Sequence, residues 1–131
     1  MSVRLRVLVV EDNALNRQLV RDVLELRGHE VLEAEDVPTG LALALEAVPD
    51  VAVLDIQLPG GGGEALARAL RREPRLRRLP LLAVTAYAMP GDRERFLAAG
   101  FDGYLSKPID TRAFGPTVEA FCAERSGGGD G

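Results

Sequence analysis

The sequence is poor in cysteine and histidine. This scarcity argues against a disulfide-stabilised protein and against a metal site built from cysteine and histidine ligands. Cys122 is the only cysteine among 131 residues, so no disulfide can form within the chain and a reducing compartment is expected. The one histidine, His29, follows the helix-ending Gly28 and has no neighbours with metal-ligand spacing. We therefore expect an exposed His29, a packing role for Cys122 and no metal site built from sulfur or imidazole ligands.

Long apolar runs and a strong net charge are also missing. The chain has 16 lysines and arginines against 20 aspartates and glutamates, so it is mildly acidic. Nothing in this balance favours nucleic acid or a membrane as a direct partner. The first ten residues, MSVRLRVLVV, lack the long apolar core of a signal peptide, and no run is long enough to span a bilayer. A single domain in the cytoplasm is expected.

Short apolar runs alternate with helical patterns along the chain. Strands are predicted at Leu5–Val10, Glu30–Ala34, Val51–Asp55, Leu81–Val84 and Phe101–Leu105. Helices are predicted at Ala14–Arg27, Thr39–Ala47, Glu64–Arg72 and Asp92–Ala99, and a last one carries Phe114, Val118 and Phe121 on one stripe. Five strand-then-helix units predict an α/β fold with a single five-stranded parallel sheet and helices on both faces. Right-handed crossovers favour the flavodoxin-like order 2-1-3-4-5.

Three details of these helices carry further expectations. In the first helix, Leu15, Leu19, Val23 and Leu26 mark one apolar stripe. Pro116 must begin the last helix or kink it, because proline lacks the amide donor. The basic stretch from Arg71 to Arg78 is interpreted as a solvated helix end and loop, with docking as the alternative reading on charge grounds.

Polar side chains stand where the predicted strands end. In the order 2-1-3-4-5 the first and third strands are neighbours, and the chain reverses direction beside them. The side chains at the carboxyl ends are Glu11, Asp12, Asp55, Thr85 and Lys107. Because these ends share one edge of the sheet, three acids, a hydroxyl and a lysine should converge from four distant segments.

Such a group of side chains suits phosphoryl transfer. Crowded acids repel one another unless a cation lies between them, and hard oxygen ligands indicate Mg²⁺ or a similar ion. The Asp55 carboxylate can attack phosphorus and hold the group as an acyl phosphate. Mg²⁺ on Asp12, Lys107 on the phosphoryl oxygens and a bond from Thr85 would complete the site. Taken alone, Asp55 also suits a helix cap or a turn.

The same residues resemble a known family. The segments Glu11-Asp12, Asp55-Ile56-Gln57-Leu58-Pro59, Thr85-Ala86 and Lys107-Pro108 occur in the order typical of the receiver domains of two-component response regulators. The resemblance covers Arg4 to about Arg125 and is strongest to stand-alone receivers of the DivK type and to receivers of hybrid histidine kinases. It implies a receiver domain at residues 1–125, and residues 126–131 are expected to form a flexible tail.

The resemblance also implies roles for single residues. Asp55 would accept a phosphoryl group from a phosphohistidine on a histidine kinase or a histidine phosphotransfer protein. Glu11 and Asp12 would be the acids of the Mg²⁺ site, with Asp55 and the main-chain carbonyl of Gln57 as further ligands. Thr85 and Tyr104 would form a switch pair that changes the surface from about Met89 to Phe121 and so regulates a downstream protein. The peptide bond between Lys107 and Pro108 is expected to be cis.

Two other functions are alternatives to a phosphoryl-accepting receiver, and the sequence departs from the family pattern at one loop. A receiver-like module that needs no phosphate would lack Asp55, Asp12 or Lys107, and all three are present. A Mg²⁺ phosphatase with an aspartyl nucleophile would carry a second acid at position 57, where Gln57 stands. Gly60-Gly61-Gly62 replaces the bulky residue and acid of the family, so this loop is expected to be looser than usual.

Overall fold

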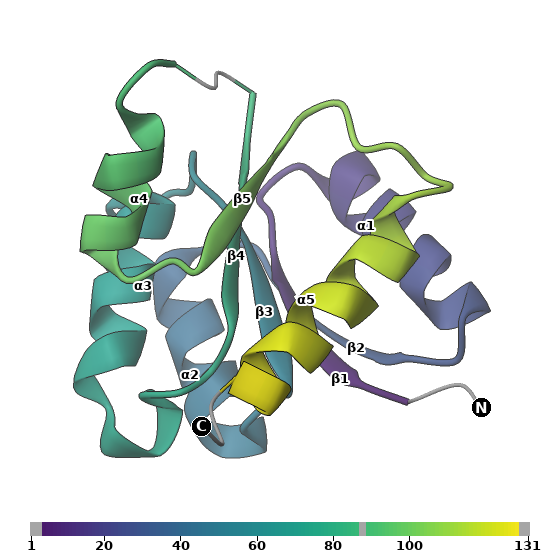
Figure 1. Cartoon of the computed structure of the whole chain (residues 1–131), viewed down its shortest axis with the longest axis horizontal. Helices are drawn as coiled ribbons and strands as arrows, with labels where there is room; N and C mark the ends of the chain where they lie inside the picture. The colour runs from purple at the N-terminus through teal and green to yellow at the C-terminus, as the bar shows by residue number, and fades with distance from the viewer. Residues whose placement is uncertain (1–3, 87–88, 129–131) are drawn as a thin grey trace.

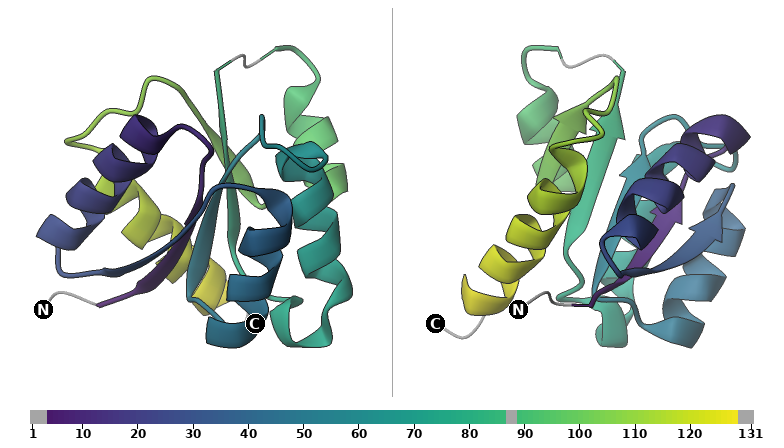
Figure 2. Two further views of the ribbon diagram at one scale, coloured as in Figure 1. Left: turned by 180° about the vertical axis from the view of Figure 1, so that it is seen from behind. Right: turned by 90° about the vertical axis from the view of Figure 1, so that its right-hand side faces the viewer.

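The computed structural model describes residues 4–86 and 89–128 and contains one parallel sheet. The strand order is β2-β1-β3-β4-β5, which confirms the predicted 2-1-3-4-5 topology. Helices cover both faces of the sheet (Figures 1 and 2). No helix in the described ranges is long and apolar enough to cross a membrane.

The observed elements follow the predicted ones closely. The strands are β1 Arg6–Val10, β2 Glu30–Ala34, β3 Val51–Asp55, β4 Leu81–Thr85 and β5 Gly103–Ser106. The helices are α1 Ala14–Leu26, α2 Val37–Ala47, α3 Gly62–Arg72, the short 3-10 helix η1 Pro74–Leu76, α4 Asp92–Ala99 and α5 Phe114–Gly128. Helix α2 begins earlier than predicted because the Asp36 side chain accepts a hydrogen bond from the Thr39 amide and caps it.

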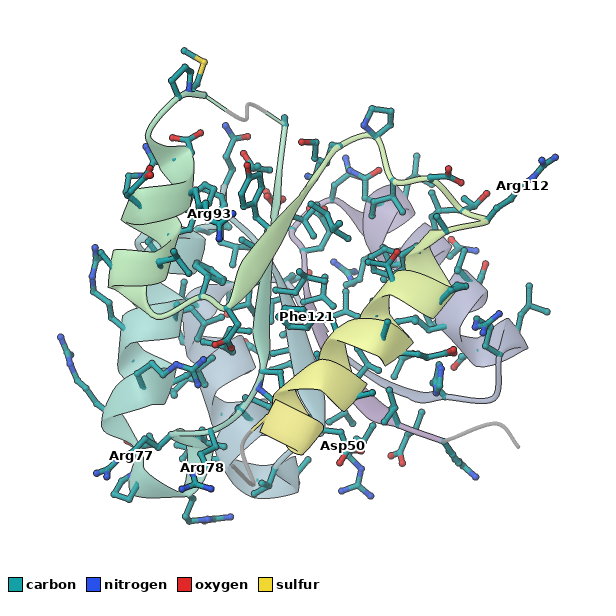
Figure 3. The ribbon with its side chains drawn as sticks, viewed as in Figure 1. Asp50, Arg77, Arg78, Arg93, Arg112 and Phe121 are labelled. Carbon is teal, nitrogen blue, oxygen red and sulfur yellow. The ribbon has the colours of Figure 1, made fainter. Side chains whose placement is uncertain are left out.

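Each face of the sheet has its own hydrophobic core. Alternate residues of β1, β3 and β4 point to opposite sides, so Leu8 and Leu54 pack under α2, α3 and α4, whereas Val7 and Val53 pack under α1 and α5. Phe121 of α5 lies toward the sheet in Figure 3 and joins the second core. The buried Cys122 belongs to that core as well, which confirms the predicted packing role.

The last helix agrees with its predicted pattern and extends beyond the predicted boundary. Phe114 and Val118 are buried, which confirms the apolar stripe. Pro116 is the third residue of α5, where its missing amide leaves no helical hydrogen bond unmade. The helix continues to Gly128, so it includes the first part of the expected tail, and residues 129–131 lie outside the described residues.

Of the predicted stripe of α1, only Val23 packs against the core. Leu15, Leu19 and Leu26 are 77%, 41% and 88% exposed, whereas Val20 and Leu24 are buried against the sheet. Both sets recur at helical spacing, so the periodicity of the sequence could not decide which one turns inward. The structure therefore leaves an apolar strip of leucines on the outside of the molecule.

His29 is also placed differently from the prediction. Its side chain is fully buried, because Nδ1 accepts a hydrogen bond from the Leu5 amide at 3.0 Å. Nε2 must then carry the proton and donates to Glu119 of α5 at 2.6 Å. Arg27 donates two further bonds to the same carboxylate, at 2.6 and 2.7 Å. Histidine here joins α5 to the start of the sheet.

Candidate functional site

Two neighbouring strands bring buried carboxylates together. Val10 of β1 pairs with Leu54 of β3, so Glu11 and Asp55 follow side by side at the same edge of the sheet. Both are nearly buried, with 6% and 5% of their surface exposed, while Asp12 is open to solvent. One ligand oxygen from each of these three residues lies within 4.8 Å of the others. The convergence expected from the sequence is thus present.

Lys107 lies between the two buried acids. Its Nζ donates to Asp55 Oδ2 at 3.0 Å and to Glu11 Oε1 at 3.2 Å. The Lys107 amide donates to the Thr85 carbonyl at 2.8 Å, which fixes the backbone after β5 against β4. The bond from Lys107 to Pro108 is cis, as predicted. One cation therefore contacts two of the three clustered carboxylates.

Burial shifts the protonation of this group. Loss of water, reinforced by the hydrogen bond with Asp55, raises the pKa of Glu11 to about 7, although the Asn13 amide and Lys107 oppose the shift. Burial alone would lower the pKa of Lys107, but its bonds to Asp55 and Glu11 raise it above the ordinary value. The lysine therefore stays charged, and its one positive charge lies beside three clustered carboxyl groups. A hard cation with oxygen ligands fits this donor set.

The Asp55 carboxylate is held at both oxygens. Oδ2 accepts from Lys107, and Oδ1 accepts from the main-chain amide of Gln57 at 3.0 Å. The backbone then turns sharply into α3, and a side chain at Gly63 would overlap the Asp55 carbonyl oxygen. Gly60, Gly61 and Gly62 all adopt positive φ angles of 92°, 117° and 86°. Glycine adopts positive φ angles readily, whereas residues with a side chain rarely do.

The two predicted switch residues lie on adjacent strands. Thr85 ends β4 and is 6% exposed, and its backbone neighbour across the sheet is Ser106 of β5. Tyr104 of β5 is 38% exposed and packs edge-on against Phe96 of α4, with ring centroids 5.7 Å apart. The hydroxyl at the site and the aromatic side chain near α4 are thus two strand positions apart.

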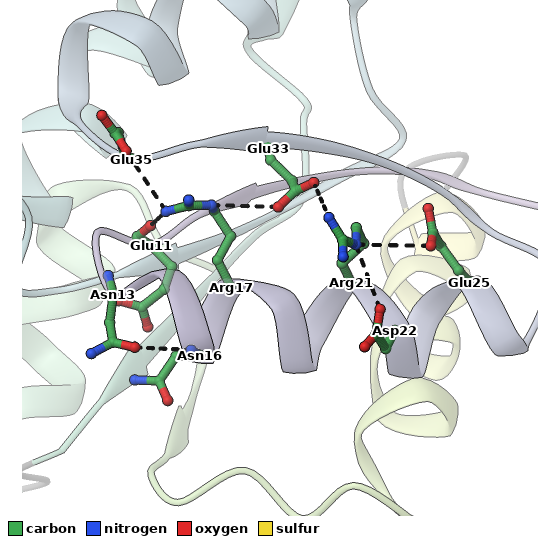
Figure 4. Close-up of polar contacts among 9 residues, drawn as sticks. All are labelled: Glu11, Asn13, Asn16, Arg17, Arg21, Asp22, Glu25, Glu33 and Glu35. Carbon is green, nitrogen blue, oxygen red and sulfur yellow. Dashed lines mark hydrogen bonds and ion pairs between the residues drawn. The ribbon is translucent and has the colours of Figure 1, made fainter.

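Sequence reasoning missed the polar support and the groove beside this site. The Asn13 amide donates to Glu11 Oε2 at 3.1 Å, and Arg17 Nη1 donates to the Glu11 carbonyl at 2.8 Å. Figure 4 shows Arg17 reaching from α1 toward Glu11 and Glu33. A groove of about 420 Å³ opens next to Lys107, and Asn16, Leu19, Ala86, Lys107, Pro108 and Ile109 line it. The sequence signal for this groove was that α1 carries two apolar sets at helical spacing, of which only one can face the core.

Comparison with protein families assigns the chain to one family. Residues 7–118 match the model of the response regulator receiver domain. The chain belongs to this family. The receiver domain is 40% identical over 118 residues to the polar-differentiation response regulator DivK of Brucella anthropi, and the match covers 90% of the chain and 96% of that relative. A DivK from Brucella ovis matches at the same identity and coverage.

Solved structures give the same fold for the receiver domain. The chemotaxis response regulator CheY4 of Vibrio cholerae is 29% identical with a TM-score of 0.86, covering 91% of this chain and 99% of that one. The receiver domain of a sensor histidine kinase from Pseudomonas aeruginosa is 30% identical with a TM-score of 0.84, covering 92% and 99%. That structure is described with a magnesium ion coordinated in the active site cleft.

Proposed function

We propose that this receiver domain accepts a phosphoryl group on Asp55 from a phosphohistidine and regulates a partner protein by changing its α4-β5-α5 surface. Membership of the receiver family assigns the chain to two-component signalling. The observation that carries the finer proposal is the position of Lys107 Nζ, within 3.0 Å of Asp55 and 3.2 Å of Glu11 beside three clustered carboxylates.

The chemistry follows from the residues at this edge of the sheet. A carboxylate oxygen of Asp55 forms a bond to phosphorus as the bond from phosphorus to the histidine nitrogen breaks and its electron pair returns to the ring. Lys107 then pairs with a phosphoryl oxygen, and Thr85 donates to another. Mg²⁺, held by Glu11, Asp12, Asp55 and the Gln57 carbonyl, would supply charge neutralisation for the phosphoryl oxygens. Gln57 provides no acid or base, so rapid hydrolysis lacks help from this position.

The groove beside the site supports a protein as phosphoryl donor. Leu19 of α1 lines this groove together with Lys107 and Pro108, and Leu15 of the same helix is also exposed. An apolar strip adjoining a reactive carboxylate suits docking of a helix that carries the phosphohistidine. A histidine kinase or a histidine phosphotransfer protein is therefore the proposed donor, in the cytoplasm and with no direct role for nucleic acid or membrane.

Phosphate labelling tests the acceptor. Incubation with acetyl phosphate and Mg²⁺ should add a single phosphoryl group, measured as the intact mass of the protein. The Asp55→Asn variant should add none, and the control Asp22→Asn, which changes an exposed acid of α1, should behave like the parent. Undiminished labelling of Asp55→Asn would refute the assignment.

The proposed coupling between Thr85 and Tyr104 can be tested separately from the phosphoryl acceptor. A hydrogen bond from Thr85 to the phosphoryl group would draw in the loop before Asp92, of which residues 87–88 lie outside the described ones, and would let Tyr104 turn inward. Thr85→Ala should then accept phosphate and transmit it poorly. Amide NMR shifts on phosphorylation should shrink in this variant from Met89 to Phe121. Equal shifts in variant and parent would disprove the coupling and leave the acceptor assignment intact.

A further inference from the structure

A dense group of arginines lies at the end of α3, away from the phosphoryl site. Residues 68–78 contain six arginines and one glutamate. The rest of the chain then has ten lysines and arginines against nineteen aspartates and glutamates. Positive charge in this acidic protein is therefore concentrated in one short segment.

Five of these six arginines are exposed and form what we call the arginine patch: Arg68, Arg72, Arg75, Arg77 and Arg78. Figure 3 shows Arg77 and Arg78 at the end of the molecule where α3 stops, far from Arg112. None of the five forms an ion pair within the described part of the chain. Elsewhere, arginines such as Arg17, Arg21 and Arg27 are paired with carboxylates.

The fold uses the sixth arginine extensively, whereas among the other five Arg75 donates to the Leu45 carbonyl at 2.9 Å and still forms no ion pair in the described ranges. Arg71 turns inward, where it bonds to the carbonyls of Gly100 and Leu79 and to Asp102. Arg72 lies in the last turn of α3, where a cation favours the helix dipole. Arg77 and Arg78 lie beyond both helices, so the dipole does not account for them. Their uncompensated charge is therefore available to a partner.

We propose that the arginine patch is a docking surface for an acidic segment of a partner protein, distinct from the surfaces used in phosphoryl transfer and switching. Its guanidinium groups match carboxylates in a bidentate geometry that lysine does not provide. All five cations of the patch are arginines. Charge complementarity thus specifies an occupant rich in aspartate and glutamate.

The composition around the patch disfavours the other polyanions. Residues 64–80 contain no aromatic side chain on which a nucleic-acid base or a membrane interface could rest. Leu76 and Leu79 are buried, so the patch presents no large apolar side chain for insertion into lipid. A long polyanion would also meet the excess acid on the rest of the molecule, whereas a short acidic segment contacts the patch alone.

The position of the patch allows docking and phosphorylation at the same time. The segment Arg77–Arg78 precedes β4, while Thr85 ends that strand at the phosphoryl site. Five residues of strand at about 3.3 Å each separate the two ends by about 16 Å. A partner on the patch would therefore tether the receiver and leave Asp55 accessible.

The test compares two variants with equal net charge. Arg72→Gln/Arg77→Gln/Arg78→Gln removes three charges from the patch, and the control Arg4→Gln/Arg93→Gln/Arg112→Gln removes three exposed arginine charges elsewhere. The probe is a fluorescent peptide of glutamates only, and binding is followed by anisotropy in about 50 mM and about 200 mM NaCl. The patch variant should bind roughly tenfold more weakly than the parent, and the control should stay within about twofold.

Binding of the parent should weaken with salt, and saturating peptide should leave labelling of Asp55 by acetyl phosphate unchanged. Equal losses in both variants, or no binding by the parent, would overturn the proposal. Tighter binding of duplex DNA or of phosphatidylserine vesicles than of the peptide would overturn the choice of an acidic protein. If the triple patch variant does not fold, Arg77→Gln/Arg78→Gln, which lies outside the helices, replaces it with Arg93→Gln/Arg112→Gln as its control.

Discussion

At the carboxyl end of the sheet, Glu11 and Asp55 are buried together with one lysine, whereas at the opposite end Asp102 and Glu119 each pair with a separate arginine. There Asp102 accepts from Arg71 at 2.8 Å, and Glu119 accepts from Arg27 and His29. Unmatched charge repels and destabilises, while matched pairs hold elements together. The first end therefore has the charge that the proposed cation and phosphoryl group would need, and the pairs at the other end stabilise the fold.

Replacing an acid at the first end should change binding more than stability. Asp12→Ala should lose most of the Mg²⁺ response because the site loses one of its three carboxylates. The free energy of unfolding without metal should stay the same or rise, because the variant has one negative charge fewer in the carboxylate cluster. Mg²⁺ titration by NMR and urea unfolding would measure the two quantities. A Mg²⁺ titration identical to that of the parent would contradict the assignment.

Removing a cation at the opposite end of the sheet should change stability more than binding. Arg71→Ala should lower the free energy of unfolding by about 3 kcal/mol, because Asp102 and several carbonyls lose their donor. The neighbouring exposed Arg72→Ala should change it by no more than about 0.5 kcal/mol. Urea unfolding of both variants gives the comparison. Equal changes in both variants would show that the hydrogen bonds of Arg71 do not stabilise the fold.

The second end should also have its own pH dependence. Hydrogen bonds from Arg27, opposed by burial and reinforced by His29, lower the pKa of Glu119 to about 2 from an ordinary 4.5. As the pH falls from about 4.5 to about 2, Glu119 binds a proton in the unfolded chain but stays ionised in the folded chain. The free energy of unfolding therefore decreases over this range. Glu119→Gln should cost about 2 kcal/mol at pH 7.

The difference between parent and Glu119→Gln should shrink as the pH falls through that window, and urea unfolding at pH 7 and at pH 3 would measure it. A difference that does not change with pH would mean that the side-chain shape, rather than the charge of Glu119, holds α5.

The smallest effect concerns strain at the second end. Val48 ends α2 with a φ of 45°, which a β-branched residue rarely adopts. Val48→Gly should relieve this strain and raise the free energy of unfolding by about 0.5 kcal/mol, after the extra entropy of the unfolded chain is counted. Thermal unfolding would detect it, with Val37→Gly as a destabilising control. A loss of stability in Val48→Gly would show that packing of Val48 outweighs its backbone strain.

The clustering of acids and a lysine at the carboxyl edge of the sheet was largely predictable from the sequence, and the supporting contacts were not. Glu11, Asp55 and Lys107 each follow an apolar strand, so the strand order alone brings them to one edge. His29 was expected to be exposed and is buried, because its donor partner, the Leu5 amide, and its acceptor partner, Glu119, are 24 and 90 residues away. No local pattern marks a pairing at such distances.

The sequence by itself determined the order of elements, the strand topology and the acids at the strand ends, because apolar periodicity and turn residues act locally. Only the tertiary structure decided which face of α1 is buried: Leu15 is exposed, and Leu19 lines a groove instead of the core. It also decided which arginine of the basic segment turns inward and which five remain exposed. These choices depend on partners that folding brings together from distant parts of the chain, so composition and spacing carry no record of them.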